Sequence, residues 1–467
     1  MPGPAIADLL RAYRAGTSDP VAALEHCLGR IAALNPRLNA LVAPDPTARA
    51  QAEASAARWR DGAPCGQLDG VPCTVKDNIP QAGLPASFGS AVYRAEVCAR
   101  DETAVARLRA AGAVLLGKTN VPEFCLEGFT ANEAFGVTRN PWNPQLTPGG
   151  SSGGAVAGVA AGMWPAAIGT DGGGSIRRPA GHTGLVGLKP TLGRVARVHH
   201  LPQLLLDMEV VGPIARTVGD AAALFAAIEG PDPADPRSHL PAEPAADAAV
   251  DSAPSALRVL YVERIGAAPL APEIAASVRH VADDLADLGH DVRQGPLPLP
   301  VERLGDLWPR IGESALAALK ARLGRRFDAA AAPYRAMAEA GERLPAGVLY
   351  KVLETIAETR VAAAALFAET DIVLLPATAA QPWPAAERFP TTIDGVAVGP
   401  RGHAVYTGWV NAAGHPAIAI PAPPAPDGMP VGAQLVGAWN RDWQLLRLAH
   451  ALERRRPWAD RWPAMAA

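Results

Sequence analysis

The sequence predicts an α/β protein, a single large α/β/α domain in which helices flank a central mixed, mostly parallel, twisted sheet. In one stretch a helix leads into an apolar strand at 113–116, and in another a strand at 258–262 is followed by a helix and by a second strand from Val292. This spacing favours parallel pairing. The connector at 231–256, rich in Pro, Ala and Asp, separates two parts that both supply strands, so we expect one sheet and not two domains.

Within this domain the chain divides into five segments. They are a helical N-terminal scaffold (1–60), the core in which the candidate catalytic residues lie (61–230), the exposed connector (231–256), a variable helical and sheet part (257–376), and the C-terminal core strands with a closing helix (377–467). The scaffold is predicted from apolar residues at helical spacing, such as Ile6, Leu9 and Tyr13. Two apolar runs, at 417–421 and 432–437, predict the buried C-terminal strands.

The composition is that of a globular protein. Of the 467 residues, 49% are hydrophobic and 19% charged, and the net charge of −3 gives no reason to expect a nucleic-acid partner. The five cysteines form no Cys-x-x-Cys pair, which fits a reducing compartment and provides no metal framework. We find no signal-peptide pattern and no apolar run of about 18 residues or more, so the sequence predicts a soluble, cytoplasmic protein with no membrane partner.

The stretch at 147–178, TPGGSSGGAVAGVAAGMWPAAIGTDGGGSIRR, carries the residues most suited to chemistry. Two glycine-rich turns, each with serine, flank a run of small and apolar residues. Glycine lets the backbone approach a ligand closely, so such turns can gather N–H groups around a substrate oxygen. A serine nucleophile needs those donors and a base. Ser175 follows three glycines and precedes a predicted helix start, whose dipole favours negative charge, so it is a candidate nucleophile.

A second motif suggests nucleotide binding. The segment 112–119, GAVLLGKT, matches the P-loop pattern G-x-x-x-x-G-K-[ST], with Lys118 as its lysine. A P-loop needs a strand before its first glycine and a helix after its lysine. Here a helix is predicted before the motif and a strand inside it, and Pro122 follows closely. This context disfavours the nucleotide-binding interpretation.

A third motif suggests an esterase of the α/β-hydrolase type. The segment 149–153 matches G-x-S-x-G, which would make Ser151 the nucleophile and require an acid and a histidine downstream. Histidines are present at several later positions. The nucleophile elbow, however, follows directly on a strand, and 143–148 (NPQLTP) does not predict one. We keep this interpretation as an alternative.

The chain resembles the amidase signature family in a set of specific motifs. The matching segments are GVPCTVKDN around Lys76, GAVLLGKTNVPEF up to Phe124, RNPWNP from Arg139, GGSSGG from Gly149, GTDGGGSIRRPA from Gly169, GLKPT from Gly187, VGPIARTV from Val211, and the C-terminal AAGHPAIAIP and PVGAQLVG. The resemblance covers most of residues 60–230 and returns after about residue 370. It implies the amidase signature fold and a serine hydrolase that cleaves amide C–N bonds to acid and amine, with no cofactor and no metal.

The resemblance implies a Ser–cis-Ser–Lys triad in which Ser175 is the nucleophile, Ser151 the bridging serine and Lys76 the base. An unperturbed lysine, with a pKa of about 10.4, is neutral in only about one molecule in 2,500 at pH 7, so burial has to lower this pKa. The remaining implied site residues are the oxyanion-hole N–H donors (Gly172, Gly173, Gly174 and Ser175), three supporting residues (Ser152, Asp171 and Arg177, the last two as an ion pair) and substrate contacts (Cys125, Leu126, Gly128, Gly149 and Gly150).

Substrate and partners are less clearly encoded. The apolar run 201–206 favours a hydrophobic or aryl amide such as an anilide, with ester or carbamate (urethane) cleavage left open. Segments with aromatic residues are further candidate pocket walls, namely those that hold Trp308, Tyr334, Tyr350, Trp383, Phe389 and Trp409. The segment 194–208, RVARVHHLPQLLLDM, lacks the serine- and tyrosine-rich stretch typical of glutamyl-tRNA amidotransferase A subunits. A stand-alone amidase acting on a small molecule is therefore favoured over an amidotransferase subunit, and a homodimer is left open.

Overall fold

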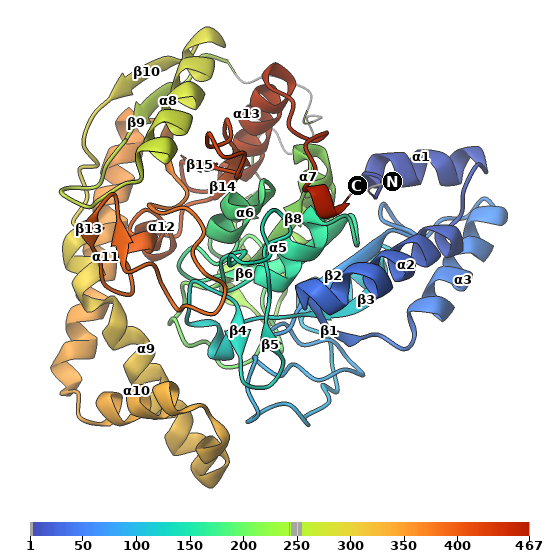
Figure 1. The fold of residues 1–467 in the computed structure, drawn as a ribbon, viewed down its shortest axis with the longest axis horizontal. Helices are drawn as coiled ribbons and strands as arrows, with labels where there is room; N and C mark the ends of the chain where they lie inside the picture. The colour runs from blue at the N-terminus through green and yellow to red at the C-terminus, as the bar shows by residue number, and fades with distance from the viewer. Residues whose placement is uncertain (1–2, 242, 244–249, 251–254, 467) are drawn as a thin grey trace.

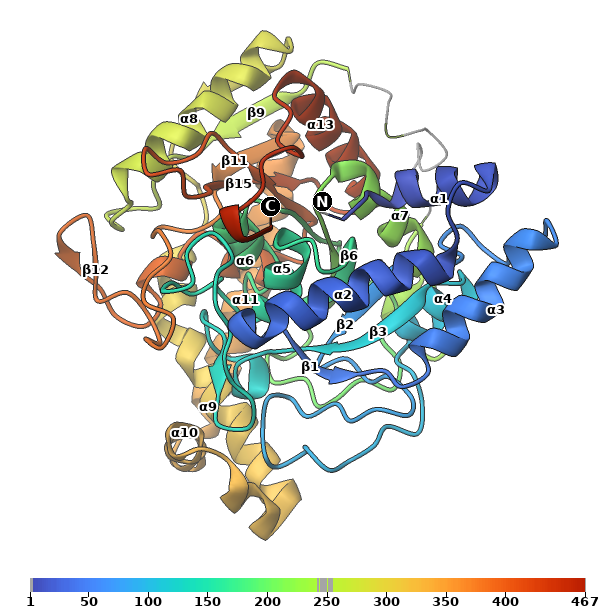
Figure 2. The same ribbon diagram turned by 45° about the vertical axis from the view of Figure 1, so that its right-hand side comes forward.

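The computed structural model describes residues 3–241, 243, 250 and 255–466. An 11-stranded sheet crosses the molecule, with helices packed on both of its faces (Figures 1 and 2). In sheet order the strands are β1 (Leu41–Pro44), β3 (Val114–Thr119), β2 (Pro72–Lys76), β6 (Ala166–Asp171), β8 (Val210–Ala215), β7 (Val186–Lys189), β14 (Ala417–Pro421), β15 (Gly432–Gly437), β11 (Ile372–Pro376), β9 (Arg258–Tyr261) and β10 (Asp291–Gln294). The prediction of a single α/β domain with a mixed sheet is confirmed.

The predicted excess of parallel pairing is wrong. Among the described strands, β2 pairs in parallel with β3 and β6, and β9 with β10 and β11, whereas the other six neighbouring pairs of the sheet are antiparallel. The β-α-β spacing correctly indicated the parallel units at the two ends. The centre of the sheet, from β6 to β11, is built instead from strands that run opposite to their neighbours. Two short hairpins, β4–β5 (Ala131–Asn132, Gly136–Val137) and β12–β13 (Thr392–Ile393, Val396–Ala397), lie outside it.

Alternation along the strands divides the interior into two cores. On β3, Leu115 faces the larger core while Val114 and Leu116 face the smaller one, as expected for side chains that alternate across a sheet. The smaller core is covered by α2 (Pro20–Leu38), α3 (Ala48–Arg60), α5 (Gly153–Ala160) and α6 (Arg177–Thr183), and the larger by α1 (Ile6–Ala15), α4 (Thr103–Ala110), α7 (Val218–Ile228), α8 (Pro272–Asp287), α12 (Gly408–Ala413) and α13 (Asp442–Arg455). The candidate active site lies where β2 and β6 end, at Lys76 and Asp171.

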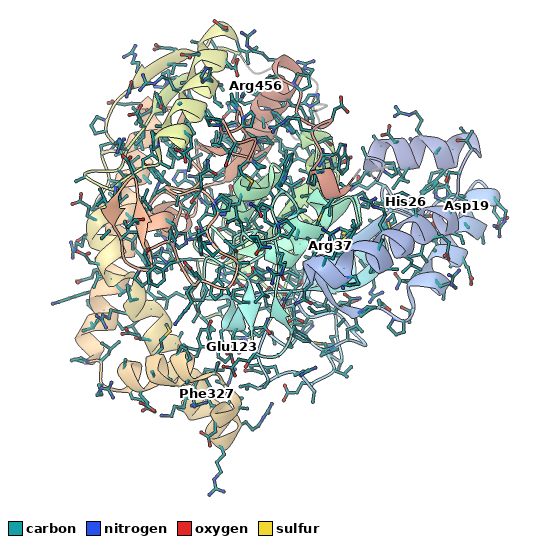
Figure 3. All side chains as sticks on the ribbon, in the orientation of Figure 1. Asp19, His26, Arg37, Glu123, Phe327 and Arg456 are labelled. Carbon is teal, nitrogen blue, oxygen red and sulfur yellow. The ribbon has the colours of Figure 1, made fainter. Side chains whose placement is uncertain are left out.

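Three long helices, α9 (Val301–Leu323), α10 (Ala332–Glu342) and α11 (Ala346–Glu369), form an arm beside the sheet, at the lower left of Figure 1. An aromatic contact joins the arm to the core, because Phe124 stacks on Phe327 with 5.9 Å between ring centroids. Glu123, which lies near Phe327 in Figure 3, accepts a hydrogen bond from the Ala331 N–H. Trp308 of α9 lies against the glycine-rich loop, where a Cβ added at Gly173 would be 2.7 Å from Trp308 Cζ2.

Three elements differ from the sequence-based expectation. The scaffold at 1–60 contains a strand, β1, in addition to its helices, of which α2 is capped by Asp19 (Figure 3). The glycine- and alanine-rich run between the two turns forms α5 and β6. Gly158 of α5 lies so close to the Trp164 ring that an added Cβ would be 1.8 Å from it. The packing therefore requires glycine at this position, although glycine has a low helix propensity.

Part of the predicted exposed connector is packed. Of this segment, residues 242, 244–249 and 251–254 lie outside the described residues. In the described part Asp235, Ser238 and Glu243 are buried. The Glu243 carboxylate accepts the N–H groups of Trp443 and Gln444 at 2.8 Å, and so satisfies backbone donors at the start of α13 that have no acceptor within the helix.

Candidate active site

Two adjacent parallel strands bring the two halves of the site together. β2 ends at Lys76 and β6 ends at Asp171, and because the strands are parallel both ends lie at the same edge of the sheet. The glycine-rich loop follows β6 and leads into α6. The other glycine-rich turn, which carries Ser151, leads into α5, and the Ser152 N–H donates to the Ser175 carbonyl oxygen at 3.1 Å. The edge therefore gathers one lysine and three serines from segments that are distant in sequence.

The Lys76 ammonium group is fully buried and has three oxygen neighbours. Its Nζ lies 2.8 Å from Ser151 Oγ, 2.8 Å from Thr170 Oγ1 and 3.1 Å from the Thr170 carbonyl oxygen. Asn78 in turn hydrogen-bonds to Thr170 Oγ1 at 3.1 Å. None of these neighbours is a carboxylate, so the charged form of Lys76 has no direct counter-ion.

This environment lowers the pKa of Lys76 below its ordinary value of 10.5. Burial is the largest cause, since it disfavours the charged ammonium. The more distant carboxylates of Glu209 and Asp171 act in the opposite direction and do not restore the ordinary value. At a given pH, a larger fraction of Lys76 is therefore neutral in the folded protein than for a free lysine in water.

Asp171 holds the glycine-rich loop through its carboxylate. Oδ1 accepts the Gly174 N–H at 2.7 Å, and Oδ2 accepts the Ile176 N–H at 3.0 Å and the Arg177 Nε–H at 3.0 Å. Arg177 Nη2 lies 2.9 Å from Oδ1, and both side chains are fully buried, as the predicted ion pair requires. Burial by itself raises the pKa of Asp171, but the charge and hydrogen bonds of Arg177 more than offset this and hold the pKa well below its ordinary value.

These contacts correct the expected set of oxyanion donors. Gly174 belongs to that set, yet its N–H already donates to Asp171, so it is not free to meet a substrate oxygen. Within the described part of the chain, the N–H groups of Gly172, Gly173 and Ser175 donate to no recorded acceptor. The donor set is therefore reduced to these three.

Arg177 also ties the loop to the C-terminal segment. Its guanidinium donates to the Thr407 carbonyl at 3.3 Å and to the side-chain oxygens of Gln434 and Asn411. Asn411 Nδ2 in turn donates to the Asp171 carbonyl oxygen at 2.9 Å. Thr407, Asn411 and Gln434, like Thr170, were not singled out from the sequence. Thr170 sits inside the matched motif at 169–180, and Gln434 inside the one at 430–437, whereas nothing local marked the other two.

A cavity of about 270 Å³ opens onto Ser175. Its apolar walls include Leu126, Leu205, Trp308, Met337 and Phe389, and its polar groups are the side chains of Cys125, Glu127, Arg178, Arg388, Arg401 and His403. Cys125, Leu126 and Gly128 thus line the cavity, as expected. Gly149 and Gly150 do not; they pack against Pro179, His182 and Phe129, where an added Cβ would collide. The structure therefore shows these two glycines in close packing and does not place them at the cavity.

Several aromatic residues considered as pocket walls lie elsewhere. Tyr334 packs edge-on against Phe124, Trp409 is buried beside a neighbouring cavity, and the Tyr350 side chain is exposed. Trp383 lies between the rings of His182 and His403. Only Trp308 and Phe389 of the expected set line the cavity at Ser175.

The two alternative motifs have the wrong surroundings. Residues 114–119 form β3, so the P-loop pattern lies inside a strand, and Lys118 is buried and donates to the Ile79 carbonyl oxygen. Ser151 has no strand directly before it; the bond preceding it, Gly150–Ser151, is cis. Its recorded side-chain partners among the described residues are Lys76 and Cys125, and no histidine.

Cys125 is the one other nucleophilic side chain at the cavity. Burial raises the pKa of its thiol to about 12, which keeps it protonated at neutral pH. In the described part of the chain no three His, Cys, Asp or Glu side chains are grouped to hold a metal ion, and no helix there is long and apolar enough to span a membrane.

Comparisons with known proteins identify the family of the chain. The amidase family model matches residues 22–446. The chain is 37% identical to putative amidase AmiA2 of Mycobacterium tuberculosis, over 98% of this chain and 95% of that one. It is 33% identical to the glutamyl-tRNA(Gln) amidotransferase A subunit of Symbiobacterium thermophilum, over 96% of each. The crystal structure of a bacterial aryl acylamidase of the amidase signature family superposes with a TM-score of 0.92 at 28% identity, over 100% of this chain and 99% of that one. From this match across most of its length, the chain belongs to the amidase signature family of hydrolases.

Proposed function

We propose that this protein hydrolyses amide C–N bonds through an acyl-enzyme on Ser175, with Ser151 as the bridging proton carrier and Lys76 as the base. The observations that carry the proposal are the buried Lys76 Nζ, 2.8 Å from Ser151 Oγ, and a cavity that Ser175 lines. The raised pKa of the nearby Cys125 thiol argues against a thiolate nucleophile.

The hydrogen bonds of Lys76 fit a neutral amine. A neutral amine has two N–H donors and one lone pair. Thr170 offers two acceptors, its carbonyl oxygen and its hydroxyl, and so uses both donors. The lone pair is then left for the Ser151 hydroxyl, which donates to it. In this state Ser151 Oγ is ready to accept the proton of Ser175.

In the proposed reaction an acyl ester forms on Ser175 and is then hydrolysed. Ser175 Oγ attacks the carbonyl carbon of the amide while its proton passes to Ser151 and the Ser151 proton passes to Lys76. The carbonyl oxygen becomes an oxyanion, which the N–H groups of Gly172, Gly173 and Ser175 stabilise. The C–N bond breaks as the proton returns along the same path to the leaving nitrogen. Water then attacks the acyl ester with the same base, and releases the acid and free Ser175.

The cavity walls support an apolar substrate body. Leu126, Leu205 and Trp308 surround the space beside Ser175, so an aryl or alkyl amide such as an anilide fits the lining, with aryl esters and carbamates as further substrates. The similarity to an aryl acylamidase supports the same choice. The departure of segment 194–208 from the amidotransferase pattern favours hydrolysis by this chain alone, in water and without tRNA.

The test is the intact mass of the protein after treatment with an aryl fluorophosphonate. We expect one adduct on the wild type and on Cys125→Ala, and none on Ser175→Ala. An adduct that persists in Ser175→Ala but disappears in Ser151→Ala would overturn the assignment in favour of a Ser151 nucleophile. A panel of anilides, aryl esters and aryl carbamates, assayed with the purified chain alone, then tests the substrate class.

A further inference from the structure

The cavity at Ser175 contains more positive than negative charge. Three arginines line it, and one carboxylate, Glu127. Glu127 forms an ion pair with Arg388, which neutralises both. Arg178 and Arg401 form no ion pair with a described residue, and so two guanidinium groups face the cavity without a counter-ion.

Arg178 is held beside the nucleophile. It lies three residues after Ser175 in the first turn of α6, and its side chain is 6% exposed. Its Nε is 3.4 Å from the Gly174 carbonyl oxygen and its Nη1 is 3.4 Å from His403 Nε2, both long contacts to neutral acceptors. Burial lowers the pKa of His403 well below its ordinary value, so this imidazole is neutral and adds no charge.

Arg401 approaches the same loop from the C-terminal segment. Its guanidinium carbon lies 4.5 Å above the centre of the Trp308 ring. That ring covers the glycine-rich loop so closely that a Cβ added at Gly173 would be 2.7 Å from Trp308 Cζ2. Trp308 therefore fixes the Arg401 guanidinium next to the loop that carries Ser175, and its side chain makes no recorded hydrogen bond with a described residue.

The charge of Arg178 also perturbs Arg401. Burial lowers the pKa of Arg178 to about 10 and that of Arg401 to about 9. The next largest cause is the opposing attraction of Asp171 at Arg178 and the repulsion by Arg178 at Arg401. Both remain protonated at neutral pH. An anion bound in this cavity would offset the unfavourable effect of the Arg178 charge on Arg401, and the guanidinium fork is suited to donate hydrogen bonds to such an anion.

We propose that Arg178 and Arg401 form a carboxylate subsite, and that the substrates are amides with an apolar body that carry a carboxylate at one end. This inference rests on the proposed amide hydrolysis at Ser175. The planar guanidinium matches the geometry of a carboxylate, and the apolar walls suit the hydrocarbon between that carboxylate and the scissile amide.

Matched substrate pairs test the proposal. Glutaric acid monoanilide is compared with pentananilide for a carboxylate on the acyl side, and 4-acetamidobenzoate with 4-methylacetanilide for one on the amine side. We expect kcat/KM to favour the anionic member of at least one pair by about tenfold or more, the typical worth of a buried hydrogen bond to a charged group. Arg401→Gln should bring that ratio close to one. Arg293→Gln, which changes an arginine with an 80% exposed side chain, should leave it unchanged.

Binding to Ser175→Ala separates this proposal from the proposed function. Calorimetry of the Ser175→Ala variant with glutaric acid monoanilide and 4-acetamidobenzoate should detect binding of the preferred anion. In the double variant that carries both Ser175→Ala and Arg401→Gln, this binding should be weaker by about tenfold or more. Arg401→Lys, which keeps the charge and loses the fork, should give intermediate binding. Hydrolysis of both members of each pair at equal kcat/KM overturns the carboxylate subsite and leaves amide hydrolysis intact. Arginine-dependent binding without hydrolysis of any of the four compounds overturns the proposed function and supports the subsite.

Discussion

Replacing Asp171 by asparagine should destabilise the protein and slow acylation together. The Asp171 carboxylate is fully buried and accepts hydrogen bonds from Gly174, Ile176 and Arg177. Asparagine is nearly the same size, but it has no charge and its NH₂ group would face donors. The Arg177 guanidinium would then be left buried without its counter-ion, and the Gly174 N–H would lose its acceptor or share it.

The size of the effect follows from the burial of the pair. Removing one partner of a buried ion pair costs about 3–5 kcal/mol. With an unfolding entropy of about 2.1 cal/mol/K per residue, a chain of 467 residues has about 1 kcal/mol/K at its midpoint, so Tm should fall by about 3–5 °C. Because the pKa of Asp171 is lowered on folding, this contribution is present above about pH 4 and is lost only as the pH falls below it.

Calorimetry at pH 7 measures the first effect and the rate of fluorophosphonate labelling the second. The control is Asp291→Asn, which removes the partner of Arg293 in an exposed pair and should shift Tm by about 1 °C or less. Displacement of the loop donors should slow labelling of Asp171→Asn by about tenfold to 100-fold. Equal Tm shifts in the two variants would refute the reasoning about the buried pair, and unchanged labelling would show that the loop does not depend on it.

Two further predictions concern Lys76 and the glycines of the small core. Lys76→Met should lower kcat/KM by about 10²–10⁴-fold and abolish the acid limb of the pH profile of kcat/KM. In the wild type the midpoint of this limb should lie below 10.5, because burial lowers the pKa of Lys76. An unchanged acid limb in the variant would assign the limb to another group. Gly158→Ala should destabilise the protein in denaturant unfolding, because the new Cβ would be 1.8 Å from Trp164. Gly29→Ala lies on the exposed side of α2 with nothing within 4 Å of its new Cβ, so it should stabilise the protein by about 0.5–1 kcal/mol. Equal effects at both sites would contradict the packing argument.

Local sequence patterns were sufficient to predict the elements that depend only on residues close together in the sequence. The strands β3, β9, β14 and β15 were predicted from short apolar runs, and the parallel end units from strand–helix–strand spacing. β6 was missed because its residues, AAIGTD, are small and lie between glycine-rich turns. The antiparallel centre was missed because pairing direction depends on strands from opposite halves of the chain, such as β7 and β14.

The sequence by itself determined the family resemblance and singled out Lys76, Ser151 and Ser175 as candidates, because each lies in a short motif and these residue types suit the proposed chemistry. Only the tertiary structure decided which groups are free to act. It engaged the Gly174 N–H with Asp171, supplied Thr170 as the partner of Lys76, and left Arg178 and Arg401 without an ion-pair partner among the described residues. The physical reason is that hydrogen bonding, burial and charge depend on every segment packed around a group. At this site those segments come from both ends of the chain.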